Sequence, residues 1–120
     1  MSGTQVSDPA GAVTVRDPAE IERTPWEPLR GLSGVEHKVL WRSGEMIAGL
    51  VRVAAGAEEP GHVHTDADHH VYVLQGSARI AGQPVAAGGF AYVPAGVPHS
   101  TDDVGPEGCT FFYTYLPRHR

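Results

Sequence analysis

The sequence predicts an all-β domain, a sandwich or barrel of short strands, and three observations support this. The chain has 120 residues, a length typical of one domain. Its 15 glycines and 10 prolines are spread along the chain, a pattern that suits short strands joined by tight turns. Segments rich in branched and aromatic residues alternate with these turn residues, and no segment indicates a helix longer than two turns.

The first part of the chain is expected to hold little regular structure. Residues 1–12 are small and polar and predict a mobile N-terminal arm, after which a single domain covers 13–120. The segment "VTVR" (13–16) is a possible short strand. The segment "DPAEIER" (17–23) predicts one helical turn, capped by Asp17 and with proline at its first position.

Strand patterns dominate the rest of the chain. The segments read as strands are "VEHKVLW" (35–41), "EMIAGLVRVA" (45–54), "VYVLQG" (71–76), "SARIAG" (77–82), "GGFAYVPAG" (88–96) and "CTFFYTYLP" (109–117). The fourth continues the third after a bend at Gly76. The segment "AGQP" (81–84) predicts a hairpin turn, and "AGAEEPG" (55–61) is expected to be a loop.

Charge and cysteine content exclude several classes of protein. Nine Lys and Arg against 14 Asp and Glu give a net charge of −5, which argues against binding nucleic acid or an anionic membrane surface. The single cysteine, Cys109, forms no internal disulfide and is expected to be buried rather than nucleophilic. The N-terminus has no signal-peptide pattern and no apolar run is long enough to span a bilayer. These features predict a cytoplasmic protein.

The stretch "GHVHTDADHH" holds four of the seven histidines. His62 and His64 are two positions apart, so on a strand both rings can face one cavity. After the turn "TDAD", His69 and His70 are adjacent, so on the returning strand they point to opposite faces and only one can join the first pair. A further imidazole, His99, follows the next strand. Convergent imidazoles are the ligands of a transition-metal site.

Two segments resemble the two sequence motifs of the cupins. In "GAEEPGHVHTDADHHVYVLQG" the matching residues are Gly56, His62, His64 and Gly76; in "GGFAYVPAGVPHSTDD" they are Gly88, Pro94, Gly96 and His99. Together the motifs cover roughly residues 56–103. The resemblance implies a cupin double-stranded β-helix, that is, a jelly-roll barrel of six to eight strands with a metal at its open end. It also implies that His62, His64 and His99 are metal ligands.

The chain departs from the cupin pattern at two positions. Asp103 stands where the second motif ends in Asn, a residue expected in a turn. His69 stands where the first motif has Glu, which selects His69 rather than His70 as the inward residue. The predicted ligands of one divalent metal are His62, His64, His69 and His99.

A longer segment narrows the resemblance to one branch. The segment "PWEPLRGLSGVEHKVLW…GLVRVAAGA" resembles the ChrR-like cupins. That branch is similar to zinc-binding anti-sigma modules and to three-His iron enzymes such as acetylacetone dioxygenase and dihydroxyacetophenone dioxygenase. Small cupins with four His ligands to manganese are a further comparison.

The expected chemistry follows from an all-imidazole site. Such ligands suit Fe(II), Mn(II), Co(II), Ni(II), Cu(II) or Zn(II), and Fe(II) is the metal favoured by the leading hypothesis. Without a carboxylate ligand the metal keeps its +2 charge and attracts an anionic or enolisable small molecule. The leading hypothesis is an Fe(II)-type dioxygenase acting with O₂ on a small enolisable or phenolic substrate. The alternatives are a redox-neutral isomerase, cyclase or lyase, and a non-enzymatic zinc-binding sensor.

Two further expectations concern partners. A sensor of the anti-sigma type normally carries a helical sigma-binding domain, whereas here only 12–15 residues precede the first possible strand. Small cupins usually form homodimers through a sheet edge, and 13–16 could cover that edge in a partner. The sequence therefore predicts a homodimer that binds a small molecule and neither nucleic acid nor membrane.

Positions around the histidines can be assigned in part. If His69 points inward, so does Val71, and Tyr72 then lies on the opposite face. Arg52 could either bind a substrate carboxylate inside the cavity or face solvent. Asp68 is expected in the turn before the strand, with contact to the imidazoles as the alternative.

Overall fold

The computed structural model describes residues 11–62, with the side chain of His62 left out, and residues 66–118. One short helix precedes the strands, and the first six elements are α1 (Pro18–Arg23), β1 (Glu27–Pro28), β2 (Val35–Ser43), β3 (Met46–Val53), β4 (Glu59–His62) and β5 (Ala67–Ile80). The remaining four are β6 (Gln83–Ala86), β7 (Phe90–Val93), β8 (His99–Asp102) and β9 (Cys109–Pro117). The described chain is therefore mostly β, as predicted.

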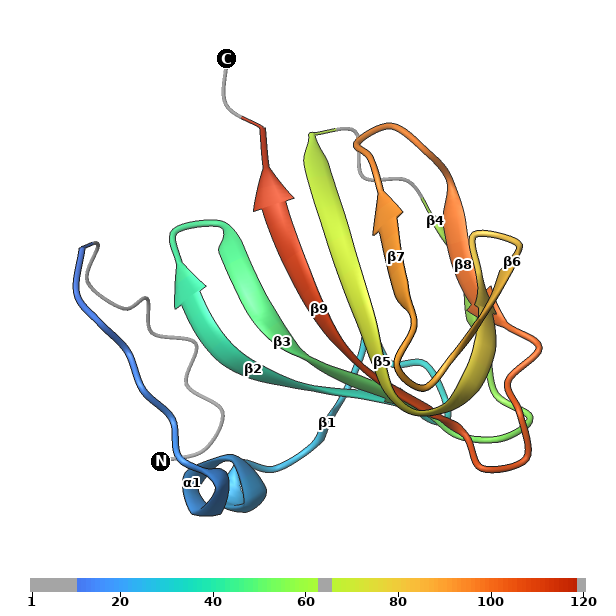
Figure 1. Ribbon diagram of the computed structural model, residues 1–120, viewed down its shortest axis with the longest axis horizontal. Helices are drawn as coiled ribbons and strands as arrows, with labels where there is room; N and C mark the ends of the chain where they lie inside the picture. Colours follow the sequence, from blue (N-terminus) through green and yellow to red (C-terminus); the bar gives the residue numbers. More distant parts are fainter. Residues whose placement is uncertain (1–10, 63–65, 119–120) are drawn as a thin grey trace.

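The strands form one antiparallel sheet that curls on itself (Figure 1). Its order is β1-β2-β3-β9-β5-β8-β4, and both β6 and β7 pair with β5. One wall consists of β2, β3, β9, β5 and β7, and the other of β4, β8, β6 and the last part of β5. The curl leaves an interior between the two walls, which is the jelly-roll arrangement that the sequence predicted.

A bend at Gly76 lets β5 belong to both walls. Gly76 has φ +76°, and a Cβ at this position would lie 1.8 Å from the carbonyl oxygen of Gly108, so the bend requires glycine. The register against β9 also shifts just before Gly76. As a result Val73 is buried before the bend, whereas Ala78 and Ile80 are buried after it. The predicted bend is confirmed.

A hydrophobic core occupies part of the interior between the two walls. It consists of Val35, Val51, Val53, Val71, Val73, Ala78, Ile80, Cys109 and Phe111. The predicted hairpin turn beside it is also confirmed, since Ala81 and Gly82 have φ +51° and +78° between paired Ile80 and Gln83. Two positive φ values are the signature of the type I′ turn, whose twist matches that of paired strands.

The helix α1 lies against the outer side of β2. The Asp17 carboxylate accepts a hydrogen bond of 2.8 Å from the Glu20 amide, which confirms the predicted cap. Lys38 on β2 donates to the carbonyl of Ile21 at 2.8 Å and lies 4.9 Å from the centre of the Trp26 ring. These contacts explain how a lysine can be buried at 6% exposure.

Several local predictions were wrong or fall outside the described residues. Residues 13–16 form no strand, because no neighbouring strand pairs with them, and Val13 and Val15 are 91% and 80% exposed. The segment 55–61 was expected to be a loop, but its last residues start β4, which pairs with the distant strand β8. The predicted mobile arm lies almost entirely outside the described residues. None of the described helices has the length and apolar character needed to cross a membrane.

Candidate metal centre

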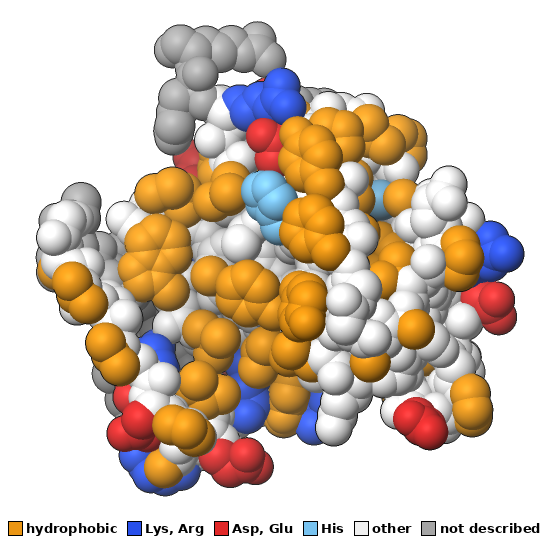
Figure 2. Space-filling view, in the orientation of Figure 1, with side chains coloured by type: hydrophobic (Ala, Val, Ile, Leu, Met, Phe, Trp, Pro, Cys, Tyr) orange, Lys and Arg blue, Asp and Glu red, His pale blue; other side chains and the backbone are white. Residues whose placement is uncertain are grey.

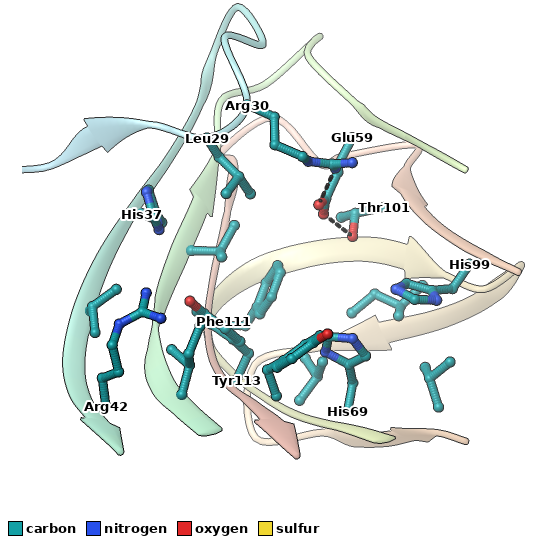
Figure 3. A pocket seen from close by; sticks show the side chains of 17 residues that line it. Leu29, Arg30, His37, Arg42, Glu59, His69, His99, Thr101, Phe111 and Tyr113 are labelled. Carbon is teal, nitrogen blue, oxygen red and sulfur yellow. Dashed lines mark hydrogen bonds and ion pairs between the residues drawn. The ribbon is translucent and has the colours of Figure 1, made fainter. Parts of the chain in front are cut away.

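A cavity of about 290 Å³ lies between the two walls. Its apolar lining includes Leu29, Val39, Ile47, Val51, Val71 and Phe111. Polar side chains enter it from different strands and are shown in Figure 3. A mostly apolar cavity with a few placed polar groups is the usual form of a small-molecule site.

His69 and His99 meet in this cavity. They come from β5 and β8, and their ring centres lie 5.1 Å apart with an angle of 56° between the ring planes (Figure 3). The ring of Tyr115 packs edge-on against His69 at 5.3 Å, which limits rotation of the imidazole. Two of the four predicted ligands are therefore brought together by strands far apart in the sequence.

The surroundings of His99 indicate which of its two ring nitrogens is available to bind a metal. Its Nδ1 atom lies 3.2 Å from the carbonyl oxygen of Val97, and a carbonyl can only accept a hydrogen bond. The proton of the neutral ring therefore belongs on Nδ1, and Nε2 carries the lone pair that a metal needs. Such a backbone contact is the common way of orienting a metal-binding histidine.

The other two predicted ligands, His62 and His64, lie where the described part of the chain is interrupted. His62 is the last residue of β4, and its Cα is the register partner of the Cα of His99. The side chain of His62 and the whole of His64 lie outside the described residues. Within the described part, no group of three or more His, Cys, Asp or Glu side chains is close enough to hold a metal. The four-histidine set thus stays a prediction, although the two described imidazoles fit a transition metal in position and chemistry.

His70 lies on the other face of β5. Its Nδ1 is 2.9 Å from the hydroxyl of Thr114, and its ring centre is 5.3 Å from that of Tyr92 and 6.0 Å from that of Phe90. Tyr72 also lies on this face and is 45% exposed. Strand alternation therefore separates His69 from His70 as predicted.

An ion pair in the cavity was not predicted from the sequence. The Arg30 guanidinium donates to the Glu59 carboxylate at 2.7 Å, and the Thr101 hydroxyl lies 3.5 Å from the other carboxylate oxygen (Figure 3). Glu59 is buried, and its exposed fraction is 9%. Glu59 falls in the segment expected to be a loop, and its partners are 29 and 42 residues away, so no local pattern indicates the contact.

A second polar cluster consists of His37, Arg42 and Tyr113. Burial lowers the pKa of His37; Glu27 opposes the shift and Arg42 adds to it. Burial raises the pKa of Tyr113 to about 12, against the opposing charge of Arg42. At neutral pH the imidazole of His37 is therefore uncharged and the phenol of Tyr113 keeps its proton.

The place of the Tyr113 ring depends on a glycine in the adjacent strand. Gly49 is the register partner of Tyr113, and a Cβ on Gly49 would lie 2.9 Å from Cε1 of that ring and 2.5 Å from the carbonyl oxygen of Lys38. A side chain here would displace the phenol from the cavity wall.

Arg52 and Asp68 do not approach the imidazoles. Arg52 pairs with Glu36 at 2.7 Å and lies 4.3 Å from the ring centre of Trp26, so its possible place in the cavity is ruled out. Asp68 lies within β5 rather than in the turn and accepts hydrogen bonds of 2.9 and 3.0 Å from Arg118. These bonds, together with one from the Ala95 amide, lower the pKa of Asp68 to about 2.

Two other residues behave as the sequence predicted. Cys109 is 2% exposed, and burial raises the pKa of its thiol, so it is a core residue. Asp103 forms a bend directly after β8 with φ +48°, a conformation that Asp and Asn tolerate better than most residues.

Comparison with known families identifies the domain. The family model of the ChrR cupin-like domain matches residues 15–118. The chain belongs to the ChrR-like cupins. No curated protein matches its sequence. Cupins commonly bind a metal ion, in agreement with the position of His69 and His99 in the cavity.

Several solved structures have a fold similar to that of this cupin. One is Rhodobacter sphaeroides SigE in complex with the anti-sigma ChrR, with 26% identity over 78% of this chain and 50% of that chain and a TM-score of 0.66. Another is the polyketide cyclase RemF from Streptomyces resistomycificus, with 23% identity over 88% and 82% of the two chains and a TM-score of 0.71. A third is a candidate acetylacetone dioxygenase from Methylibium petroleiphilum PM1, with 20% identity over 88% and 79% and a TM-score of 0.69. The last two similarities show the fold alone.

Proposed function

We propose that this cupin is a metal-dependent enzyme, most specifically an Fe(II)-type dioxygenase acting on a small enolisable or phenolic substrate. The observation that supports this best is the meeting of His69 and His99, with ring centres 5.1 Å apart, in an apolar cavity. In the proposal, His62 and His64 complete the ligand set, and the metal when bound supplies a +2 charge and coordination positions for substrate and O₂.

The chain itself contributes shape and exclusion of water. A cavity of about 290 Å³ is at the lower end of the range for ligand sites, so it fits a small molecule rather than a polymer. Val71 and Phe111 supply apolar walls that favour a planar substrate and exclude water from charged groups. Tyr115 holds the His69 ring in place by its edge-on contact.

Two other functions are supported by relatives with the same fold. A redox-neutral reaction is the first alternative, since one similar structure is that of a polyketide cyclase. A non-enzymatic zinc sensor is the second, since another is that of an anti-sigma factor. The three functions differ in whether the metal has open positions and whether O₂ is consumed.

The test starts from protein loaded with Fe(II) under anaerobic conditions. Nitric oxide is added and the electron paramagnetic resonance spectrum is recorded. We expect an iron-nitrosyl signal, since a catalytic site needs an open position; bound iron without such a signal would favour a closed, sensory site. Oxygen consumption with β-diketones and phenols then separates a dioxygenase from a redox-neutral enzyme.

We also propose that the protein is a homodimer. Val13 and Val15 are largely exposed on a segment outside any helix or strand, and such a segment can add to an open sheet edge of a second copy. Light scattering should give the mass of a dimer at micromolar concentration, and a monomer would contradict the proposal.

A further inference from the structure

The polar cluster of His37, Arg42 and Tyr113 lies at a different end of the cavity from the imidazoles of His69 and His99. His37 and Arg42 come from β2, which is separated from β5 by β3 and β9. Three strand spacings correspond to roughly 14 Å along the sheet. Figure 3 shows His37 and Arg42 on one side of the cavity and His69 and His99 on the other.

A bulge in β2 turns Arg42 into the cavity. His37 and Val39 face inward as alternate residues, and the register of β2 against β3 then shifts between Val39 and Trp41. Because of this shift the even-numbered Arg42 faces inward as well. The bulge therefore places a guanidinium group in the same cavity wall as His37.

Among the described residues that line the cavity, positive side chains outnumber negative ones. The described lining contains two guanidinium groups, Arg30 and Arg42, and one carboxylate, Glu59. Glu59 pairs with Arg30 at 2.7 Å. In an apolar environment such an excess favours binding of an anion.

The two neighbours of Arg42 can donate hydrogen bonds to an anion. Tyr113 keeps its phenolic proton at neutral pH, and Arg42 and Tyr113 point toward each other in Figure 3. The Nδ1 atom of His37 is buried and has no hydrogen-bond partner among the described residues. A buried nitrogen without a partner is unfavourable, and a group bound at this end could offset that cost.

We propose that Arg42, Tyr113 and His37 form a carboxylate-binding subsite for an elongated small organic acid. Its apolar body would lie along the cavity and its other end would face His69 and His99. Arg42 supplies a charge and a planar fork of donors that matches a carboxylate. The part of this inference that concerns the metal end rests on the proposed function, whereas the subsite itself requires no metal.

The test uses two probes that differ only in charge, 4-fluorobenzoate and the neutral 4-fluorobenzamide. Binding to metal-free protein is followed by ¹⁹F NMR, so that a metal cannot hold the carboxylate. The variants are Arg42→Gln and Tyr113→Phe, and Arg52→Gln is the matched control because Arg52 lies on the outer face.

The expected pattern is specific to Arg42. 4-Fluorobenzoate should bind the wild type and Arg52→Gln equally, at least tenfold more weakly to Arg42→Gln, and several-fold more weakly to Tyr113→Phe. 4-Fluorobenzamide should bind wild type and Arg42→Gln with the same low affinity. If Arg42→Gln does not fold, Arg42→Lys replaces it, with intermediate affinity expected because the charge remains and the fork is lost.

Three results would overturn the subsite. They are no binding of 4-fluorobenzoate to the wild type, equal binding of both probes, and equal weakening by Arg42→Gln and Arg52→Gln. A Co(II) titration of the same variants separates this failure from that of the proposed function. Arg42→Gln should bind Co(II) as the wild type does, and absence of Co(II) binding in every protein would remove the metal centre but not the subsite.

Discussion

His69 and His70 are neighbours in the chain but lie in opposite surroundings. His69 faces the cavity, next to His99 and Tyr115. His70 lies on the outer face, against Thr114 and Tyr92. The comparison shows that a step of one residue along β5 decides whether an imidazole can join a metal site, because side chains alternate between faces.

The two faces differ in more than their histidines. The inner face is mostly apolar, and its polar groups gather at particular points of the cavity. The outer face carries exposed aromatic residues, with Phe90 61% and Tyr92 48% exposed. Hydrophobic side chains gather over β5 and β7 in the space-filling view (Figure 2). An apolar surface of this kind is common on proteins that associate, in keeping with the proposed homodimer.

The largest effect on stability should come from a pair of phenylalanines, one on each face. Phe111 is 4% exposed and lies in the core, whereas Phe90 is 61% exposed. Phe111→Ala should lower the free energy of unfolding by about 4 kcal/mol, because it leaves a cavity. Phe90→Ala, the matched control, should change it by less than about 1 kcal/mol. Urea denaturation measures both, and equal losses would contradict this division of the faces.

A smaller loss is expected at the bend that carries β5 from one wall to the other. In Gly76→Ala the new Cβ would meet the carbonyl oxygen of Gly108, and the positive φ adds strain. We expect a loss of about 3 kcal/mol. Gly56→Ala is the control, since Gly56 also has positive φ but open space around it, and should cost about 1 kcal/mol. Similar midpoints of thermal unfolding would show that the contact is not needed.

The smallest effect concerns the outer face and depends on pH. The pKa of Asp68 is lowered from 3.8 to about 2 in the folded protein by its bonds to Arg118 and to the Ala95 amide. A lowered pKa stabilises the fold above about pH 4, and this contribution is lost as pH falls through about 2. Wild type should therefore be more stable than Asp68→Asn at pH 6, and the difference should shrink between pH 4 and 2.

Arg118→Gln provides the control for this prediction. In that background the change Asp68→Asn should have a smaller effect at pH 6, because the main bonding partner is gone. A difference between wild type and Asp68→Asn that stays constant from pH 6 to pH 2 would contradict the assignment.

Local patterns were enough to predict much of the fold. The cap at Asp17, the bend at Gly76 and the inward direction of His69 each depend on a few neighbouring residues. The alternation of Val51, Arg52 and Val53 also indicates that Arg52 faces outward, although the sequence left both directions open.

Other features depend on pairing between distant segments. The strands β4 and β8 are short and polar, and they form because β4 pairs with β8 and β8 also pairs with β5. The Glu59 ion pair depends on the same pairing. The inward direction of Arg42 results from the bulge in β2, which reverses the alternation that a regular strand would have. No residue pattern within a single strand indicates such a bulge.

The most direct test of the metal centre compares His69→Ala with His70→Ala. Co(II) is titrated into each metal-free protein and into the wild type, and binding is followed by absorbance and calorimetry. We expect His69→Ala to weaken binding about a hundredfold or more, or about 2.7 kcal/mol, and His70→Ala to change it by less than about twofold. Loss of Co(II) binding in His70→Ala, with normal binding in His69→Ala, would contradict the assignment of the inner face as the metal site.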